Sequence, residues 1–172
     1  MKRLLLYVVH VLLAFLTLNN ILALSPLIDA TPNLLLIITF SFGFIRGKKE
    51  GMLLGFFCGL LMDICYGEIL GYYALIYLVI GFVNGTLGQL FYTEFLNMPL
   101  LLCILSDLIY NLYIYVFGFL LYGRLDLPVY VATVILPEVV YTAILTLVLY
   151  KLFLKLNTRF EELEKRSAKR FV

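Results

Sequence analysis

In the run Gly51-Met-Leu-Leu-Gly55-Phe-Phe-Cys-Gly59-Leu-Leu-Met-Asp63, a glycine stands at every fourth position until an acid takes the place of the next one. Residues four apart lie on one face of a helix. The run therefore predicts a helix with a groove free of side chains and a carboxyl group at its end. Such grooves let a second helix approach closely in lipid. We take Gly51, Gly55, Gly59 and Asp63 as a candidate groove for a partner helix. Packing against another span of the same chain is the alternative.

The composition around this run is that of an integral membrane protein. Of the 172 residues, 63% are hydrophobic and 14% are charged, and the mean hydropathy is +1.03. Soluble domains are about 45–50% apolar, and a soluble chain of this size could not bury the excess. These values exclude a water-soluble monomer, a disordered chain and a secreted disulfide scaffold. The length predicts one domain.

Breaks at charged residues, prolines and glycines divide the chain into six apolar spans. They fall at about 4–24, 27–45, 51–66, 70–92, 99–122 and 128–150. We expect an all-α integral membrane protein with six transmembrane helices, in which 1–155 form one membrane domain and 156–172 form a charged cytoplasmic tail. The second and third spans are short for a hydrocarbon core of about 30 Å. Neighbouring helices, not lipid, are therefore expected around their ends.

The basic residues indicate the orientation of these spans. With the N-terminus in the cytoplasm, 12 of the 13 Lys and Arg residues fall on the cytoplasmic side, and Arg124 is the exception. Membrane proteins concentrate Lys and Arg in their cytoplasmic segments. Both termini are therefore expected in the cytoplasm.

Polar side chains inside the spans form the second group of candidate residues. We expect buried polar groups at His10, Asp63, Asp107, Asn111 and Glu138. No Lys or Arg lies within a span, so each acid is expected to be protonated or hydrogen-bonded. Pro137 removes a backbone donor and frees the carbonyl of Thr133, where a water cluster could bind. Whether the three acids share one cavity stays open, and proton or ion transport is the alternative role.

No sequence motif indicates catalysis. The chain has no HExxH, no G-x-S-x-G and no phosphate-binding glycine loop. One histidine and three scattered cysteines do not form a convincing metal site. We therefore expect no enzyme activity, no metal and no cofactor.

The residues from 32 to 85 resemble those of a known family. Pro32-Asn33-Leu34 opens the second span, the Gly51–Asp63 run follows, and Gly71, Tyr72, Ala74, Leu75 and Gly81 continue the pattern. Together with the length and the six spans, this resembles the rod shape-determining MreD family. The resemblance implies a multi-pass protein of the bacterial cell membrane with a fold similar to the S components of energy-coupling-factor transporters. Asp63 matches the acidic position of the family.

The same resemblance implies the partners. Proteins of this family work with MreC, which has a single membrane helix, and with the actin-like MreB and the elongation glycosyltransferase and transpeptidase. The implied function is that of a non-catalytic membrane scaffold that maintains rod shape. No role in binding nucleic acid is expected.

A vitamin-binding S component of an energy-coupling-factor transporter is the alternative function. Such proteins typically carry an A-x-x-x-A pair on the first span, whereas Ala14 and Ala23 here are nine residues apart. The segment 25–32, which would cap the ligand, is short and has one acid, Asp29. Both features favour the scaffold.

Overall fold

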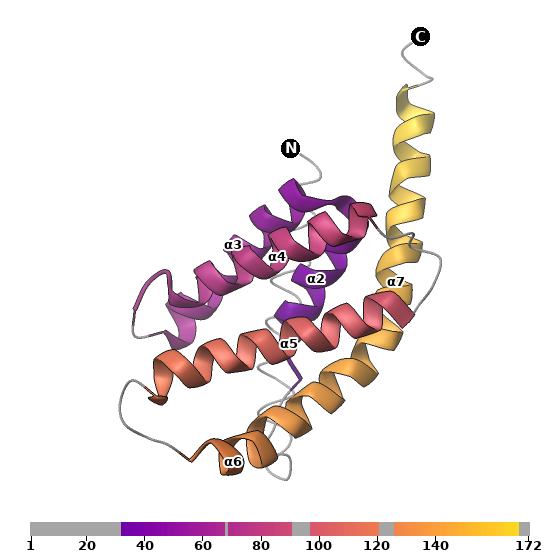
Figure 1. The fold of residues 1–172 in the computed structure, drawn as a ribbon. Coiled ribbons are helices and arrows are strands. Elements are labelled where there is room, and N and C mark those ends of the chain that lie inside the picture. Colours follow the sequence, from indigo (N-terminus) through magenta and orange to yellow (C-terminus); the bar gives the residue numbers. More distant parts are fainter. Residues whose placement is uncertain (1–31, 68, 91–96, 121–125, 169–172) are drawn as a thin grey trace.

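The structure is a computed structural model that describes residues 32–67, 69–90, 97–120 and 126–168. This part of the chain is helical and contains no strand (Figure 1). Its elements are α2 (Leu34–Arg46), α3 (Lys48–Tyr66), α4 (Tyr72–Leu90), α5 (Asn97–Gly118), α6 (Leu127–Tyr130), the π-helix η2 (Val131–Ile135) and α7 (Leu136–Ala168). The predicted span at 4–24, and His10 with it, lies outside the described residues.

Helix α2 lies at the centre of the bundle. Ten of its 13 residues are buried, and its side chains are almost all apolar. A helix that is apolar on every side is stable only when other helices surround it. Helices α3, α4, α5 and α7 all contact α2 (Figure 1). This explains how a helix too short to cross a bilayer alone is accommodated.

A single residue, Gly47, joins α2 to α3. Its φ angle is 94°, a conformation that side chains other than glycine rarely adopt. The Gly47 N–H donates to the carbonyl of Gly43 at 2.8 Å, and the Gly51 N–H donates to the Gly47 carbonyl at 3.0 Å. The two helices therefore reverse direction with almost no loop.

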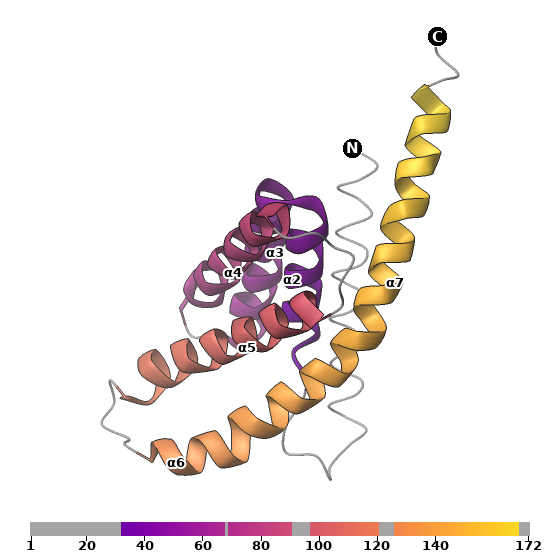
Figure 2. The same cartoon turned by 45° about the vertical axis from the view of Figure 1, so that its right-hand side comes forward.

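The last helical segment is irregular just before Pro137, the proline that the sequence indicates as a missing backbone donor. Residues Val131–Ile135 form a π-helix, in which the Leu136 N–H bonds to the carbonyl of Val131, five residues back. Proline cannot donate to the carbonyl four residues earlier, and its ring crowds that carbonyl. A wider turn just before Pro137 relieves this conflict. Helix α7 then continues to Ala168, so the predicted tail begins as a continuation of α7 (Figure 2).

Three helices of the described chain are long and apolar enough to cross a membrane. They are Tyr72–Leu90, Met98–Gly118 and Leu127–Lys155. Helix α2 is apolar but shorter, and α3 carries charged residues in its first turn. The apolar helical segments expected from the sequence are thus present within the described residues. The count of six spans and the orientation stay predictions.

Candidate functional site

The glycine face of α3 packs against α4 of the same chain. A Cβ atom built on Gly51 would lie 2.5 Å from the Gly81 carbonyl and 2.6 Å from the Cα atom of Gly43. Cβ atoms built on Gly55 and Gly59 would overlap the α4 backbone in the same way. The face is therefore filled, and the alternative of internal packing describes this structure. No open groove for a partner helix exists at these positions in the structure.

The contact extends to a glycine that the spacing argument did not single out. Gly43 of α2 meets Gly51 of α3 and Gly81 of α4, so three backbones converge without an intervening side chain. Gly43 lies eight residues before Gly51, so the four-residue spacing of the glycines extends back to it. The signal was present in the sequence, but the turn at Gly47 places Gly43 on another helix.

Asp63 links the end of α3 to the beginning of α4 by hydrogen bonds. Its side chain is 3% exposed, and its carboxylate accepts hydrogen bonds from the backbone N–H groups of Tyr73 at 2.7 Å, Gly71 at 2.9 Å and Ala74 at 3.1 Å. The first N–H groups of a helix have no partner within the helix, and a carboxylate there also matches the helix dipole. Asp63 thus caps α4 from α3. This is the hydrogen bonding to backbone that the sequence predicts for the buried acids.

Asn33 connects three helices at the start of α2, and the sequence argument did not predict this. Its Oδ1 accepts from the Leu36 N–H at 3.1 Å, which caps α2, and from the Tyr77 hydroxyl at 2.7 Å. Its backbone N–H donates to the Thr142 hydroxyl at 3.2 Å. The Pro32-Asn33 pair therefore has a structural role, because it joins α2 to α4 and α7.

Polar side chains form a seam between α5 and α7. They recur one helical turn apart on each helix: Cys103, Asp107 and Asn111 on α5, and Glu138, Thr142 and Thr146 on α7. Cys103 Sγ and Thr146 Oγ1 lie 3.0 Å apart, and the Asn111 side chain reaches the Glu138 carboxyl. Small polar side chains of this kind hold membrane helices together.

Asp107 differs from the other two acids in its surroundings. It is completely buried, and neither carboxyl oxygen has a hydrogen bond of ordinary geometry. The Thr142 hydroxyl faces this carboxyl but lies outside that geometry. Of the two states expected for the acids, hydrogen-bonded or protonated, the structure shows hydrogen bonds at Asp63 and none of ordinary geometry at Asp107. An unsatisfied buried carboxyl needs a neutral state, a water or an ion to explain it.

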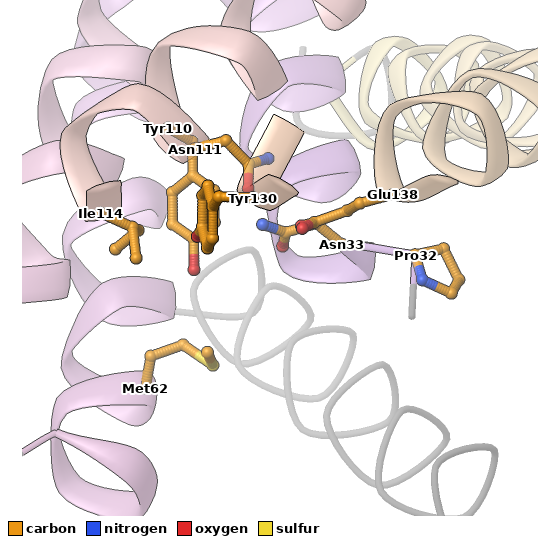
Figure 3. Close-up of a pocket in the computed structure, with 8 residues that line it drawn as sticks. All are labelled: Pro32, Asn33, Met62, Tyr110, Asn111, Ile114, Tyr130 and Glu138. Carbon is orange, nitrogen blue, oxygen red and sulfur yellow. The ribbon is translucent and has the colours of Figure 1, made fainter. Parts of the chain in front are cut away.

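A cavity of about 220 Å³ lies at the end of this seam that Asn111 and Glu138 form (Figure 3). Its polar lining comes from Asn33, Tyr110, Asn111, Tyr130 and Glu138. Its apolar lining comes from Pro32, Met62 and Ile114. Glu138 lines the cavity, whereas Asp107 is not among the described residues that line it. Asp63 bonds to the first turn of α4 and is not among the described residues that line the cavity. The three acids therefore do not share one cavity.

The π-helix shapes this cavity. Tyr130 and Glu138 are eight residues apart, which in a regular α-helix would turn them about 80° away from each other. The extra residue of a π turn reduces this to about 20°. Both side chains then reach the same space, as Figure 3 shows.

The described residues contain no group of three or more His, Cys, Asp or Glu side chains that could hold a metal ion. One further polar contact links two helices. Asn84 of α4 donates to the Ser106 hydroxyl of α5 at 2.7 Å.

Polar groups of the described helices turn inward. Large apolar side chains remain exposed on the outer faces of α3, α4, α5 and α7. Together these features define a helical integral membrane protein. Comparison with known families gives the particular one. The family model described as rod shape-determining protein MreD matches residues 1–160, so the chain belongs to the MreD family. It is therefore a rod shape-determining membrane protein and part of the MreBCD shape machinery. No curated protein and no solved structure matches the chain.

Proposed function

We propose that this protein is a non-catalytic scaffold of the bacterial elongation machinery. It crosses the cell membrane six times with both termini in the cytoplasm, binds the single membrane helix of MreC and holds the cell-wall synthases nearby. Family membership supports the role in rod shape. The partners and the number of spans are our inference.

One observation carries the proposal: most of the buried polar groups described are used to hold the fold together. Asp63 caps α4, Asn33 joins three helices, and Asn84 bonds to α5. A constellation for catalysis would instead bring a nucleophile, a base and an orienting group into one site. The described residues outside the cavity form no such arrangement.

The surface left for recognition is helical and apolar. Helices α2 and α3 are joined by one residue, and α3 and α4 by the five residues 67–71. Large apolar side chains are exposed along α4, α5 and α7, among them Val79, Leu112 and Ile144. A single-span partner would pack on such a face. Because α4 fills the glycine face of α3, docking has to use an outer face.

Affinity purification from native membranes tests this proposal. The tagged chain is extracted in mild detergent, and both proteins and small molecules are identified by mass spectrometry. An unrelated multi-span protein with the same tag is the matched control. We expect MreC and the elongation synthases to be enriched over that control. A stoichiometric vitamin together with two ATPase subunits would overturn the proposal in favour of the transporter component.

A further inference from the structure

We propose that the cavity lined by Asn33, Tyr110, Asn111, Tyr130 and Glu138 is a binding site for a small primary ammonium group. The proposal goes beyond the scaffold function and does not depend on it. It rests on the charge, geometry and size of the cavity.

The first argument is that the carboxyl groups at the cavity have no cationic partner among the described lining residues. Glu138 lines the cavity, and Asp107 lies on α5 one helical turn before the lining residue Asn111. No Lys, Arg or His is among the described lining residues. Carboxyl groups inside membrane-spanning helices normally pair with a cation or with nearby polar groups. The Asp107 carboxyl has no such partner of ordinary geometry. A cationic ligand beside Glu138 would be the missing partner and would stabilise the ionised form of its carboxyl.

The second argument concerns the groups that would contact the ligand. An alkylammonium has three N–H donors. The Glu138 carboxylate can accept one or two of them. Asn111 Nδ2 donates to the backbone carbonyl of Asp107 at 3.1 Å, so its Oδ1 is the atom that can accept another. The rings of Tyr110 and Tyr130 flank the same space, and aromatic faces attract cations (Figure 3).

The third argument is that the cavity is built into the helices. The π-helix Val131–Ile135 turns Tyr130 toward Glu138, at the cost of irregular backbone hydrogen bonds. Asn33 Oδ1 is occupied by two donors, which fixes its side chain at the cavity wall. The polar wall is thus held in place before any ligand arrives, which lowers the entropic cost of binding.

The size of the cavity limits the ligand. A volume of about 220 Å³ is below the roughly 300–1,000 Å³ of pockets for drug-sized molecules. It suits a small amine or the ammonium end of a larger molecule. Two sources supply this chemistry: the headgroup of an aminophospholipid, or a free amine. A lipid phosphate would remain outside, because no described basic side chain lines the cavity.

Ligand-observed NMR on the full chain in phosphatidylglycerol nanodiscs tests the proposal. The probes are propylammonium and its neutral analogue 1-propanol. We expect propylammonium to bind the wild type at least about tenfold more tightly than 1-propanol. Glu138→Gln should weaken propylammonium binding about tenfold or more. Asp126→Asn removes an exposed carboxyl whose side chain makes no capping hydrogen bond, so affinity should stay within about twofold.

A second variant keeps the test decisive if Glu138→Gln does not fold. Ile114→Phe enlarges an apolar wall residue into the cavity and should also abolish propylammonium binding, with the helical circular dichroism of the wild type retained. Equal affinity for propylammonium and 1-propanol, or wild-type affinity in a folded variant, would overturn the proposal.

Native mass spectrometry from mixed nanodiscs then identifies the source. Retention of phosphatidylethanolamine over phosphatidylglycerol by the wild type, lost in Glu138→Gln, would support the lipid headgroup. Propylammonium binding without this preference would support a free amine.

Discussion

The carboxylate of Asp63, near the end of α3, accepts a 2.7 Å hydrogen bond from the backbone N–H of Tyr73 in the first turn of α4. Two further N–H groups of the same region share this carboxylate. The most conspicuous acid in the sequence is therefore a helix cap that acts between two helices. Its burial is compensated by three donors, which is how a carboxylate can remain inside an apolar bundle.

Replacing Asp63 should destabilise the protein more than replacing any other acid described. Asp63→Ala leaves three N–H groups without their acceptor, one of them buried and two part-buried, and we expect a loss of about 3 kcal/mol. Asp63→Asn keeps one acceptor oxygen and should cost less. Thermal unfolding in detergent measures both, with the exposed Asp126→Asn as the control. Unfolding of Asp63→Ala at the wild-type temperature would contradict the role as a cap.

The glycines of α3 should not tolerate even a methyl group. In Gly59→Ala, the new Cβ would lie 2.5 Å from the Tyr73 carbonyl, so α3 and α4 must separate. Overpacking of this kind costs about 1–3 kcal/mol. Gly118→Ala at the end of α5 is the matched control, because a Cβ there meets nothing within 4 Å. Equal unfolding temperatures for the two variants would show that α3 and α4 are not in close contact.

Asp107 should behave in the opposite way to Asp63. Its carboxyl has no hydrogen bond of ordinary geometry, so Asp107→Asn or Asp107→Leu removes a desolvated group without breaking a contact. We expect stability equal to the wild type or higher by about 1 kcal/mol. The same unfolding assay, with Asp63→Asn run in parallel, checks this. A loss as large as that of Asp63→Ala would mean that Asp107 has a strong partner.

The contact between Asn84 and Ser106 should contribute a measurable coupling energy between α4 and α5. The two side chains are buried and 2.7 Å apart. Double-mutant cycles on interhelical hydrogen bonds in membranes average about 0.6 kcal/mol and reach about 1.7. A cycle of Asn84→Ala and Ser106→Ala should fall in that range. Strict additivity of the two losses would indicate that the bond does not join the helices.

The sequence predicted the helical class and the close packing of α3 correctly, for physical reasons that are local. Spacing by four puts Gly51, Gly55 and Gly59 on one face whatever the fold. It does not identify the helix that fills that face, because α4 and a partner helix satisfy the same requirement. The single-residue turn at Gly47 and the hairpin at Asp63 make α4 the nearest candidate, and both become evident only in three dimensions.

The polar connections were harder to predict. Asn33, Tyr77 and Thr142 are far apart in sequence and meet through tertiary packing. Thr142 and Thr146 follow Glu138 at intervals of four, so their shared face was visible in the sequence. The missing donor at Pro137 was evident from the sequence, but the π turn that brings Tyr130 and Glu138 to the same cavity was not predicted.

The most direct test of the scaffold function is a photocrosslinking scan in cells. A photoreactive residue is placed singly at exposed apolar positions of α4, α5 and α7, such as Val79, Leu112 and Ile144. We predict crosslinks to the single membrane helix of MreC from positions three or four apart on one outer face, and none from the other faces. Failure to crosslink MreC from any outer face, in cells where all variants are produced at the wild-type level, would contradict the proposed scaffold.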